Sequence, residues 1–422
     1  MKIKTKKLTY DEVLSLPKAK SSRPLKPSIL FRTLIRVLSI PDLIATKFKY
    51  TTHRMDEIGD SPCLILMNHS SFIDLKIAYK IFYPKPLSIV CTSDGFVGKS
   101  LLMKLIGCIP TTKFVTDLSL ISNMNYALNT LKSNVLMYPE ASYSFDGCAT
   151  PLPKRLGVLL KKLNVPVVTV ITKGAFARDP LYNGLQLRKV NVSAEVTCLF
   201  SKEDLQNLSA EELDRQLNEK FAFDNFRWQQ ENNIKINEPF RADGLNRILY
   251  KCANCGTEGS TIGKGTTMTC TNCGKEYELD EYGKLKAVEG ETEFEHIPDW
   301  FNWQRQCVLD EINCGSYKLD CDVDIGVLVD HKAIYMVGDG HLSHTVDGFK
   351  LTGCDGKIDY TQKPAAAYSL YADYFWYEIG DVICIGDKKM LYYCFPKNCG
   401  DVVAKTRLAT EEIYKINKSE KA

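Results

Sequence analysis

Two side chains, at positions 69 and 74, carry the clearest chemical signal in this chain. The apolar run 63–67 ends at Asn68, and His69 and Asp74 follow it. A carboxylate beside an imidazole accepts the proton of one ring nitrogen and leaves the other nitrogen able to take a proton. The pair therefore suits removing a proton from a hydroxyl nucleophile, without a catalytic serine or cysteine of the protein. The alternative is a surface turn that follows a buried strand and happens to carry His and Asp.

Four ordered blocks, of which this pair belongs to the first, resemble the glycerolipid acyltransferase family, and the 1-acylglycerol-3-phosphate acyltransferases in particular. The family patterns are Asn-His-x-x-x-x-Asp, Gly-x-Ile-x-x-x-Arg, Phe-Pro-Glu-Gly-Thr-Arg-Ser and Val-Pro-Val-x-Pro-Val. They are matched in order by Asn68, His69 and Asp74; by 107–113, with Lys113 at the basic position; by 138–144; and by 165–170. The third block departs from its pattern, because Ala141 replaces Gly and Tyr143 replaces the basic residue that holds the substrate phosphate in the family.

The resemblance implies an O-acyltransferase of phospholipid synthesis. Such an enzyme moves a fatty acyl group from an acyl thioester, on coenzyme A or acyl carrier protein, to the free hydroxyl of a lysophosphatidic-acid-like glycerol phosphate. His69 would be the base and Asp74 the group that orients it. The implied substrate-binding residues are Asn68, Lys113, Glu140, Ser142, Lys154 and Arg155. Lys113, helped by Lys154 or Arg155, would pair with the phosphate, and Glu140 would bind the glycerol hydroxyls, structure the site or cap a helix.

A second motif consists of two Cys-x-x-Cys knuckles that are separated by fourteen residues. The four cysteines are Cys252, Cys255, Cys270 and Cys273. Four thiolates at this spacing predict a closed tetrahedral zinc site with a structural role. The zinc would stabilise a ribbon that is too small to form a hydrophobic core of its own. Redox dithiols are the alternative. Zinc ribbons often bind nucleic acid, but the acidic segment 276–281 argues against that partner.

The first fifty residues are basic, with twelve Lys or Arg against three Asp or Glu. Apolar residues in 29–40 recur at three- and four-residue steps, which predicts an amphipathic helix that Pro41 interrupts. Such a helix can lie in a membrane interface, with Arg32 and Arg36 on lipid phosphates and Phe31 among acyl chains. Alternatively, it packs on the protein's own core. No run of about 18 apolar residues and no apolar leader is present, so we expect a cytoplasmic protein, peripheral on the inner face of the cell membrane.

Short β-rich runs alternate with helical stretches in the region of the four blocks. We expect buried strands at 63–67, 87–91, 134–138 and 165–171, and helices at 73–81, 99–106, 118–131 and 156–163. This alternation predicts an α/β layered domain with a mostly parallel sheet, in which functional residues gather where strands end. The sixteen cysteines of this long chain favour a reducing compartment over a disulfide scaffold.

The 422 residues allow two to three domains. We predict a basic N-terminal region at 1–50, an acyltransferase domain at 51–248, a zinc ribbon at 249–285 and a β-rich domain at 300–418, with an aperiodic boundary at 286–300. Short strands at 325–329, 333–337, 349–351, 375–379, 382–385 and 390–395, followed by a helix at 402–416, resemble the layout of a pleckstrin-homology-like barrel. That domain would bind a lipid headgroup or a partner, or serve a structural or dimerising role. The other function class that remains is a catalytically weakened scaffold that binds nucleic acid or a protein through the ribbon and β domain.

Overall fold

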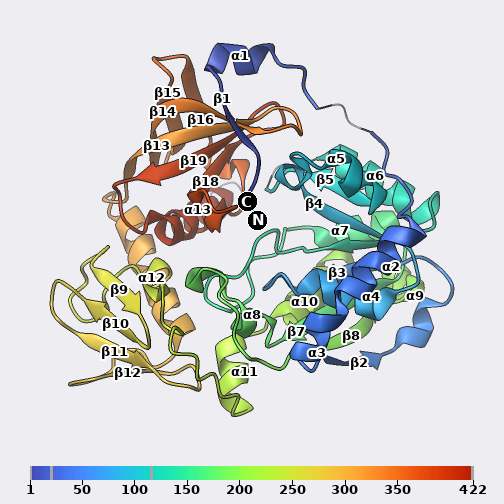
Figure 1. Cartoon of the computed structure of the whole chain (residues 1–422), viewed down its shortest axis with the longest axis horizontal. Helices are drawn as coiled ribbons and strands as arrows, with labels where there is room; N and C mark the ends of the chain where they lie inside the picture. The colour runs from blue at the N-terminus through green and yellow to red at the C-terminus, as the bar shows by residue number, and fades with distance from the viewer. Residues whose placement is uncertain (1, 20–21, 115–116, 420–422) are drawn as a thin grey trace.

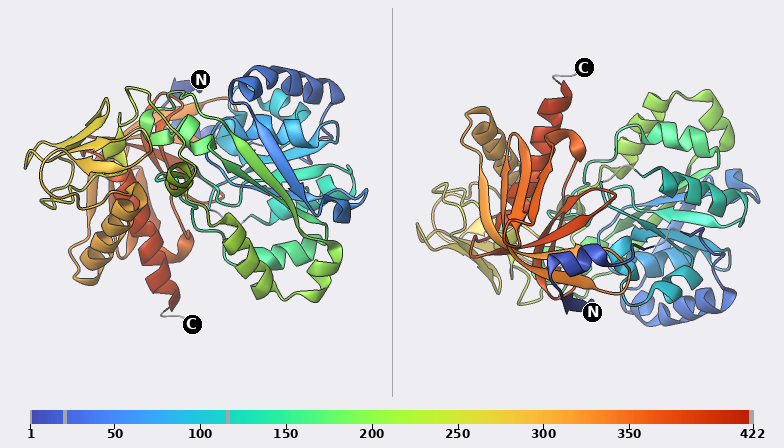
Figure 2. Two further views of the ribbon diagram at one scale, coloured as in Figure 1. Left: turned by 90° about the horizontal axis from the view of Figure 1, so that it is seen from below. Right: turned by 90° about the horizontal axis from the view of Figure 1, so that it is seen from above.

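A computed structural model describes residues 2–19, 22–114 and 117–419. Three parts can be followed in Figure 1: an α/β domain, a small four-stranded sheet and a β-rich domain that ends in a long helix. The β-rich domain and the small sheet lie side by side, and both face the α/β domain, as the views from below and above also show (Figure 2). No described helix is both long and apolar enough to cross a bilayer.

The α/β domain is built on a seven-stranded sheet in the order β2-β8-β7-β3-β6-β4-β5. Five strand pairings are parallel, and β8 runs antiparallel to β7. The strands are β2 (Lys49–His53), β3 (Leu64–Met67), β4 (Leu87–Thr92), β5 (Cys108–Thr111), β6 (Asn134–Met137), β7 (Val167–Lys173) and β8 (Ser193–Phe200). The predicted strands at 63–67, 87–91, 134–138 and 165–171 all form, but β2, β5 and β8 were missed.

Helices cover both faces of this sheet, which explains the unbroken apolar run of β3. Leu64 and Leu66 pack on the face covered by α6, α7, α9 and α10, while Ile65 and Met67 pack on the face of α4 and α5. The helices of the domain are α4 (Asp74–Phe82), α5 (Ser100–Leu105), α6 (Leu118–Asn129), α7 (Leu156–Leu163), α8 (Ala175–Arg178), α9 (Lys202–Asn207), α10 (Ala210–Phe221) and α11 (Asn225–Glu231).

The small sheet has the order β12-β11-β10-β9 and is antiparallel throughout. Its strands are β9 (Thr261–Lys264), β10 (Thr267–Cys270), β11 (Glu276–Leu279) and β12 (Leu285–Ala287). Met268, Tyr277 and Leu285 are buried in the same apolar cluster as Trp300 of α12 (Ile297–Asn313). The ribbon is therefore part of the core of the β-rich domain. The prediction of an aperiodic boundary through residue 300 was wrong at its end, because Ile297 and Trp300 anchor α12 in that core.

The β-rich domain has the order β16-β15-β14-β13-β19-β18-β17, with antiparallel pairings between neighbours. Its elements are β13 (Leu319–Leu328), β14 (Ile334–Thr345), β15 (Gly348–Gly353), β16 (Ile358–Gln362), β17 (Tyr371–Trp376), β18 (Gly380–Gly386), β19 (Leu391–Lys397) and the closing helix α13 (Val402–Ser419). The predicted strand at 375–379 was misplaced, because Phe375 has a left-handed φ of 52° at an irregularity where β17 turns into β18. The pleckstrin-homology-like identity stays a prediction. A disulfide joins Cys321 to Cys399, and the other described cysteines are free.

The N-terminal fifty residues divide between the two large domains. Strand β1 (Thr5–Lys7) pairs in parallel with β14, and helix α1 (Tyr10–Ser15) brings the Tyr10 hydroxyl to within 3.0 Å of that of Tyr392. Helices α2 (Ile29–Leu38) and α3 (Ile40–Ala45) lie instead on the α/β domain, where α2 contacts α4. The grouping of residues 1–50 as one basic region therefore missed that β1 and α1 belong to the β-rich domain.

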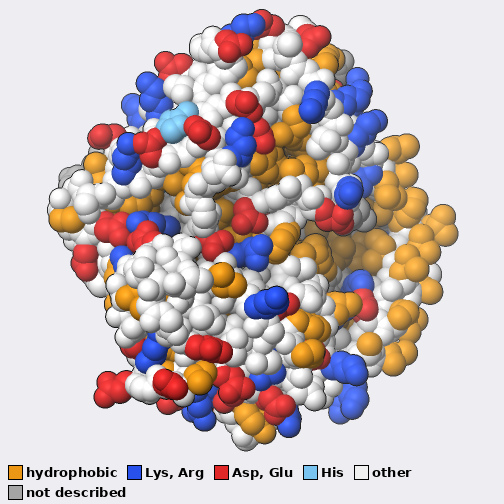
Figure 3. Space-filling model, turned by 60° about the vertical axis from the view of Figure 1, so that its left-hand side comes forward, with side chains coloured by type: hydrophobic (Ala, Val, Ile, Leu, Met, Phe, Trp, Pro, Cys, Tyr) orange, Lys and Arg blue, Asp and Glu red, His pale blue; other side chains and the backbone are white. Residues whose placement is uncertain are grey.

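Helix α2 buries polar residues and exposes apolar ones. Arg32 and the C-terminal cap residue Ser39 are buried, and the Arg32 guanidinium donates a hydrogen bond to the carbonyl of Pro84. Leu30, Leu34 and Leu38 are 70%, 48% and 65% exposed. Hydrophobic side chains gather along the right-hand edge of Figure 3, where α2 and α3 lie. The prediction that Arg32 faces lipid phosphates was wrong, because its charged head is buried and bonds to the carbonyl of Pro84 in the turn after α4.

Candidate functional site

His69 and Asp74 meet where β3 ends and α4 begins. The His69 Nδ1 lies 3.2 Å from the Asp74 Oδ2, and the same oxygen accepts the backbone N–H groups of Ser70 and Ser71 at 2.9 and 3.1 Å. Asp74 is the first residue of α4, where the helix dipole and free N–H groups favour a carboxylate. Within the described parts of the chain, no group forms a hydrogen bond with the His69 Nε2. The arrangement leaves Nε2 as the nitrogen that can take a proton.

Two tyrosine rings enclose the imidazole. The ring of Tyr138 stacks on one side of His69, with centroids 4.1 Å apart, and that of Tyr143 on the other, at 4.0 Å. Both come from the altered third block, which begins at the end of β6. Burial lowers the pKa of His69 from its ordinary value, against the hydrogen bond and charge of Asp74, which raise it. The imidazole is therefore neutral at neutral pH, as a general base requires.

Glu140 joins the third block to the first. Its Oε1 accepts the backbone N–H of His69 at 3.2 Å, and its Oε2 accepts the backbone N–H and the hydroxyl of Thr150 at 2.8 and 3.1 Å. Burial raises the pKa of Glu140 to about 7, while these hydrogen bonds oppose the rise. Of the roles predicted for Glu140, the contacts favour structuring the site over binding glycerol hydroxyls, because both carboxylate oxygens are already occupied.

Asn68 likewise fixes the framework. Its side-chain amide donates to the carbonyl of Thr172 at 3.2 Å and its oxygen accepts the Thr172 backbone N–H at 2.8 Å, so it ties the end of β3 to β7. Ser142 is 1% exposed, and its hydroxyl has no hydrogen-bond partner among the described residues. Of the two, Ser142 therefore has the polar atom left over for a ligand.

The predicted basic residues are dispersed. Lys113 follows β5, and its Nζ lies over the ring of Tyr371 on β17, 4.1 Å from the centroid. Burial lowers the pKa of Lys113, whereas the charges of Asp373 and Asp94 raise it. Lys154 and Arg155 lie exposed at the start of α7, and within the described ranges no contact joins either of them to His69 or Asp74. Among the described residues, none of the three basic side chains forms a hydrogen bond or ion pair with His69 or Asp74, and Lys113 lies against Tyr371 of the β-rich domain.

Several residues around the site have no signal in the sequence blocks. The Ser71 hydroxyl donates to Asp179, whose carboxylate also pairs with Arg178 at 3.0 Å. Burial raises the pKa of Asp179 to about 7, opposed by these partners. From the far end of the chain, Arg407 of α13 donates to the carbonyl of Tyr143 at 3.3 Å. No sequence signal links Arg407 to residue 143, because only the docking of the β-rich domain brings them together.

The four knuckle cysteines converge at one end of the ribbon. The sulfur atoms of Cys252 and Cys273 are 3.8 Å apart, as are those of Cys255 and Cys270, and all four lie within 4.8 Å of one another. Tetrahedral zinc with Zn–S bonds of about 2.3 Å requires sulfur separations of about 3.8 Å. The cluster therefore fits zinc. Four protein ligands leave no open position for a substrate, which indicates a structural ion.

Comparison with known proteins bears on the α/β domain. Residues 48–173 match the family model described as Acyltransferase. The 1-acyl-sn-glycerophosphate (LPA) acyltransferase PlsC of Thermotoga maritima is a similar solved structure, with 14% identity over 48% of this chain and 80% of that chain and a TM-score of 0.38. No curated protein matches the chain. The family match contains both His69 and Asp74 and supports an acyltransferase family for this domain.

Proposed function

We propose that this chain, whose residues 48–173 match the Acyltransferase family model, transfers a fatty acyl group from an acyl thioester to the free hydroxyl of a lysophosphatidic-acid-like acceptor. The observation that carries the proposal is the His69–Asp74 contact of 3.2 Å, with a neutral imidazole whose Nε2 is available. The donor is an acyl group on coenzyme A or acyl carrier protein, and the product belongs to phospholipid synthesis.

The reaction that this geometry supports is one proton transfer coupled to one acyl exchange. His69 Nε2 takes the hydroxyl proton of the acceptor as that oxygen attacks the thioester carbonyl carbon. The C–O bond forms, the C–S bond breaks, and the imidazolium returns the proton to the leaving thiolate. Asp74 holds Nδ1–H and stabilises the imidazolium between these steps. As the basic residue of the second block, Lys113 is our candidate partner for the acceptor phosphate, although Lys lacks the bidentate fork of Arg.

We further propose that the enzyme reaches its lipid acceptor as a peripheral protein on the inner face of the cell membrane. Support comes from the apolar face of α2 and α3, where Leu30 and Ile44 are each 70% exposed. Ile35 and Leu43 pack these helices on the α/β core, so the exposed leucines remain free to meet a lipid surface. Phe72, beside the catalytic pair, is 58% exposed and contacts Tyr143 edge-on at 5.9 Å, so an apolar residue also marks the entrance to the site.

The nucleic-acid alternative loses support from the ribbon's charges. Lys251 pairs with Glu258 and Glu311 at 3.3 and 3.4 Å, and Lys275 lies 3.8 Å from Glu293. Phosphate binding relies on cations that can release counterions, and paired lysines supply little of that free energy. The ribbon residues therefore serve the interface with α12 and α13 better than a nucleic acid.

The decisive experiment incubates the purified chain with lysophospholipids and labelled acyl thioesters and measures labelled phospholipid. His69→Ala is expected to reduce the rate by about 10²–10⁴-fold, because a general base contributes that much. His341→Ala is the matched control, since His341 is an exposed histidine of β14 that pairs with Asp320 and Asp322 away from the site. Turnover by a folded His69→Ala variant at the rate of the control would refute the mechanism.

A further inference from the structure

The loop that begins with the third block is shared between the two large domains. The ring of Tyr143 stacks on that of His69 at 4.0 Å. Two positions later, the buried Phe145 belongs to the apolar cluster of the β-rich domain, and its ring lies 4.9 Å from that of Tyr374 on β17. The loop therefore passes directly from the catalytic histidine into the core of the β-rich domain.

One peptide group of this loop is bonded at both ends. The peptide group between Tyr143 and Ser144 donates its N–H to the carbonyl of His69 at 3.3 Å. Its carbonyl oxygen accepts a hydrogen bond from Nη1 of Arg407 on α13, also at 3.3 Å. Because the N–H and the C=O of a trans peptide point in opposite directions, this group lies between the catalytic histidine and the β-rich domain. Its two bonds fix the backbone from which the Tyr143 side chain projects.

Arg407 is well suited to hold this peptide group. It is only 4% exposed, and its guanidinium lies over the ring of Phe145, 4.5 Å from the centroid. One arginine thus contacts both the residue that covers His69 and the residue that enters the β-rich core. A guanidinium is planar and presents its donors in a fixed geometry, so it restricts the position of a carbonyl more than a flexible donor would.

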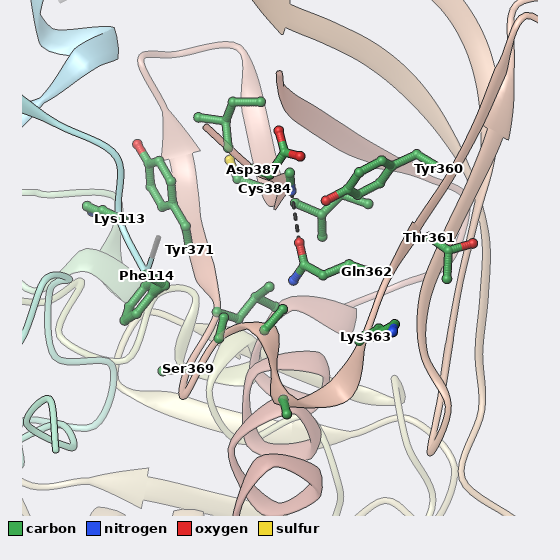
Figure 4. Close-up of a pocket in the computed structure, with 17 residues that line it drawn as sticks. Lys113, Phe114, Tyr360, Thr361, Gln362, Lys363, Ser369, Tyr371, Cys384 and Asp387 are labelled. Carbon is green, nitrogen blue, oxygen red and sulfur yellow. Dashed lines mark hydrogen bonds between the residues drawn. The ribbon is translucent and has the colours of Figure 1, made fainter. Parts of the chain in front are cut away.

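A buried network fixes the guanidinium in turn. The Nε of Arg407 lies 3.3 Å from a carboxylate oxygen of Glu411, one turn further along α13, and Glu411 also pairs with Arg305 of α12 at 2.8 Å. The hydroxyl of Ser369 donates to Glu411 at 2.7 Å. Ser369 also lines the cavity of about 400 Å³ where Lys113 meets the β-rich domain (Figure 4). Arg407 is therefore a firmly held part of the interface between the two domains.

Several titratable groups face His69 from different elements. They are Asp74 at its Nδ1, Tyr138 and Tyr143 on its two faces, Glu140 at its backbone N–H, and Lys113 through its charge. Burial is the largest cause that lowers the pKa of His69. A displaced Tyr143 ring would admit water to one face of the imidazole, and the pKa of His69 would rise.

We infer that Arg407 is a positioning residue of the acyltransferase site: from the β-rich domain, it fixes the peptide group that follows Tyr143 so that the Tyr143 ring covers His69. The inference rests on the proposed function for the reaction of His69, and it gives the β-rich domain a part in that reaction. Among the described residues, no contact joins Arg407 to His69 itself, so Arg407 acts through Tyr143.

The test measures the pKa of His69 by NMR titration of protein that contains isotope-labelled histidine, with His69→Ala to identify the signal. Tyr143→Ala should raise this pKa by about one pH unit, a fraction of the roughly 3–5 units that full burial imposes. Arg407→Met should raise it in the same direction by a similar amount. The acidic limb of kcat/KM should move to higher pH with it.

A double variant separates positioning from a direct effect of the Arg407 charge. Loss of a cation would also raise the pKa of His69, and that effect would persist without the Tyr143 ring. In the Tyr143→Ala background, Arg407→Met is therefore expected to leave the pKa of His69 where Tyr143→Ala alone puts it. A further rise in the double variant, or an unchanged pKa in Arg407→Met alone, overturns the inference.

Arg305→Met is the matched control. Arg305 belongs to the same network and pairs with Glu411 and Glu412, each at 2.8 Å, but no described contact joins it to Tyr143. This variant should lower the melting temperature and leave the pKa of His69 unchanged. A rise equal to that of Arg407→Met would show that any loosening of the interface is enough, and it would overturn the specific role of Arg407.

A second form of the Arg407 variant guards against misfolding. If Arg407→Met does not fold because Glu411 loses one of its cations, Arg407→Met combined with Glu411→Gln takes its place in every comparison. No buried carboxylate is then left without that partner, and Arg305 keeps Glu412.

The titration needs no substrate, so it separates this inference from the proposed function. The expected pattern of pKa values without acyl transfer to any lysophospholipid would support the positioning of His69 and refute the proposed reaction. Acyl transfer by an enzyme whose His69 pKa is the same in Arg407→Met as in wild type would support the reaction and overturn the inference.

Discussion

Replacing Asp74 by Asn tests how the carboxylate assists His69. The Asp74 Oδ2 accepts the backbone N–H groups of Ser70 and Ser71 as well as facing the His69 Nδ1. An asparagine must place its oxygen at that position, because its NH₂ group would oppose two N–H donors. The amide oxygen still accepts the proton of Nδ1. The structure therefore predicts that Asp74→Asn keeps the correct tautomer and loses only the negative charge.

The size of the loss follows from the distance. Two unit charges at the observed 3.2 Å attract by about 5 kcal/mol at an effective dielectric constant of about 20. If roughly half of a proton charge has developed on the imidazole in the transition state, about 2.5 kcal/mol of stabilisation is lost. This free energy corresponds to a decrease of about 10²-fold in kcat/KM. A mutant with the wrong tautomer is expected to lose about 10⁴-fold.

Steady-state kinetics over a range of pH distinguish these outcomes. Because Asp74 raises the pKa of His69, removing its charge should also move the acidic limb of the kcat/KM profile to lower pH. Circular dichroism and thermal unfolding report whether the fold is kept. A loss as large as that of His69→Ala, or an acidic limb at higher pH than in wild type, would refute the assignment of a purely electrostatic role to Asp74.

Three further predictions concern the charge near the site, the metal and the membrane. Lys113→Met should raise the pKa of His69, which burial holds below its ordinary value, and so shift the acidic limb of kcat/KM to higher pH. An unshifted limb would show that the charge of Lys113 does not act on His69. Elemental analysis should find one zinc per chain. Cys255→Ser should lower both the zinc content and the melting temperature of the β-rich domain, because ribbon side chains are part of the core of that domain. Full-length protein that contains no zinc would contradict the site. Replacing Leu30 and Leu34 together by Gln should weaken sedimentation with anionic vesicles at least tenfold, whereas the control Ile262→Gln on the ribbon should leave it unchanged. Added salt should weaken only the part of vesicle binding that is due to basic residues. Deleting residues 1–50 is a poorer test, because it also removes β1 from the β-rich domain.

The sequence alone determined the local features of this protein. The apolar runs of β3, β4, β6 and β7 identify buried strands because helices cover both faces of a parallel sheet. The spacing of His69 and Asp74 is short enough for one strand-to-helix turn to bring them together, and two Cys-x-x-Cys knuckles specify their own geometry. The amphipathic pattern of 29–40 was also readable. The sequence did not show which face of that helix is exposed, because only the tertiary structure shows that Arg32 turns inward.

Tertiary structure decided what surrounds the catalytic pair. Tyr143 reads in the sequence as a lost basic residue, yet its ring encloses His69 and contributes to the burial that lowers the pKa of His69. Lys113 and Gln362 are 249 positions apart and line one cavity, and Arg407 reaches Tyr143 from the last helix. No periodicity or spacing encodes such contacts, because they depend on how two separately patterned domains dock. Local sequence patterns therefore determine the fold of each part, whereas long-range packing determines the environment of the site.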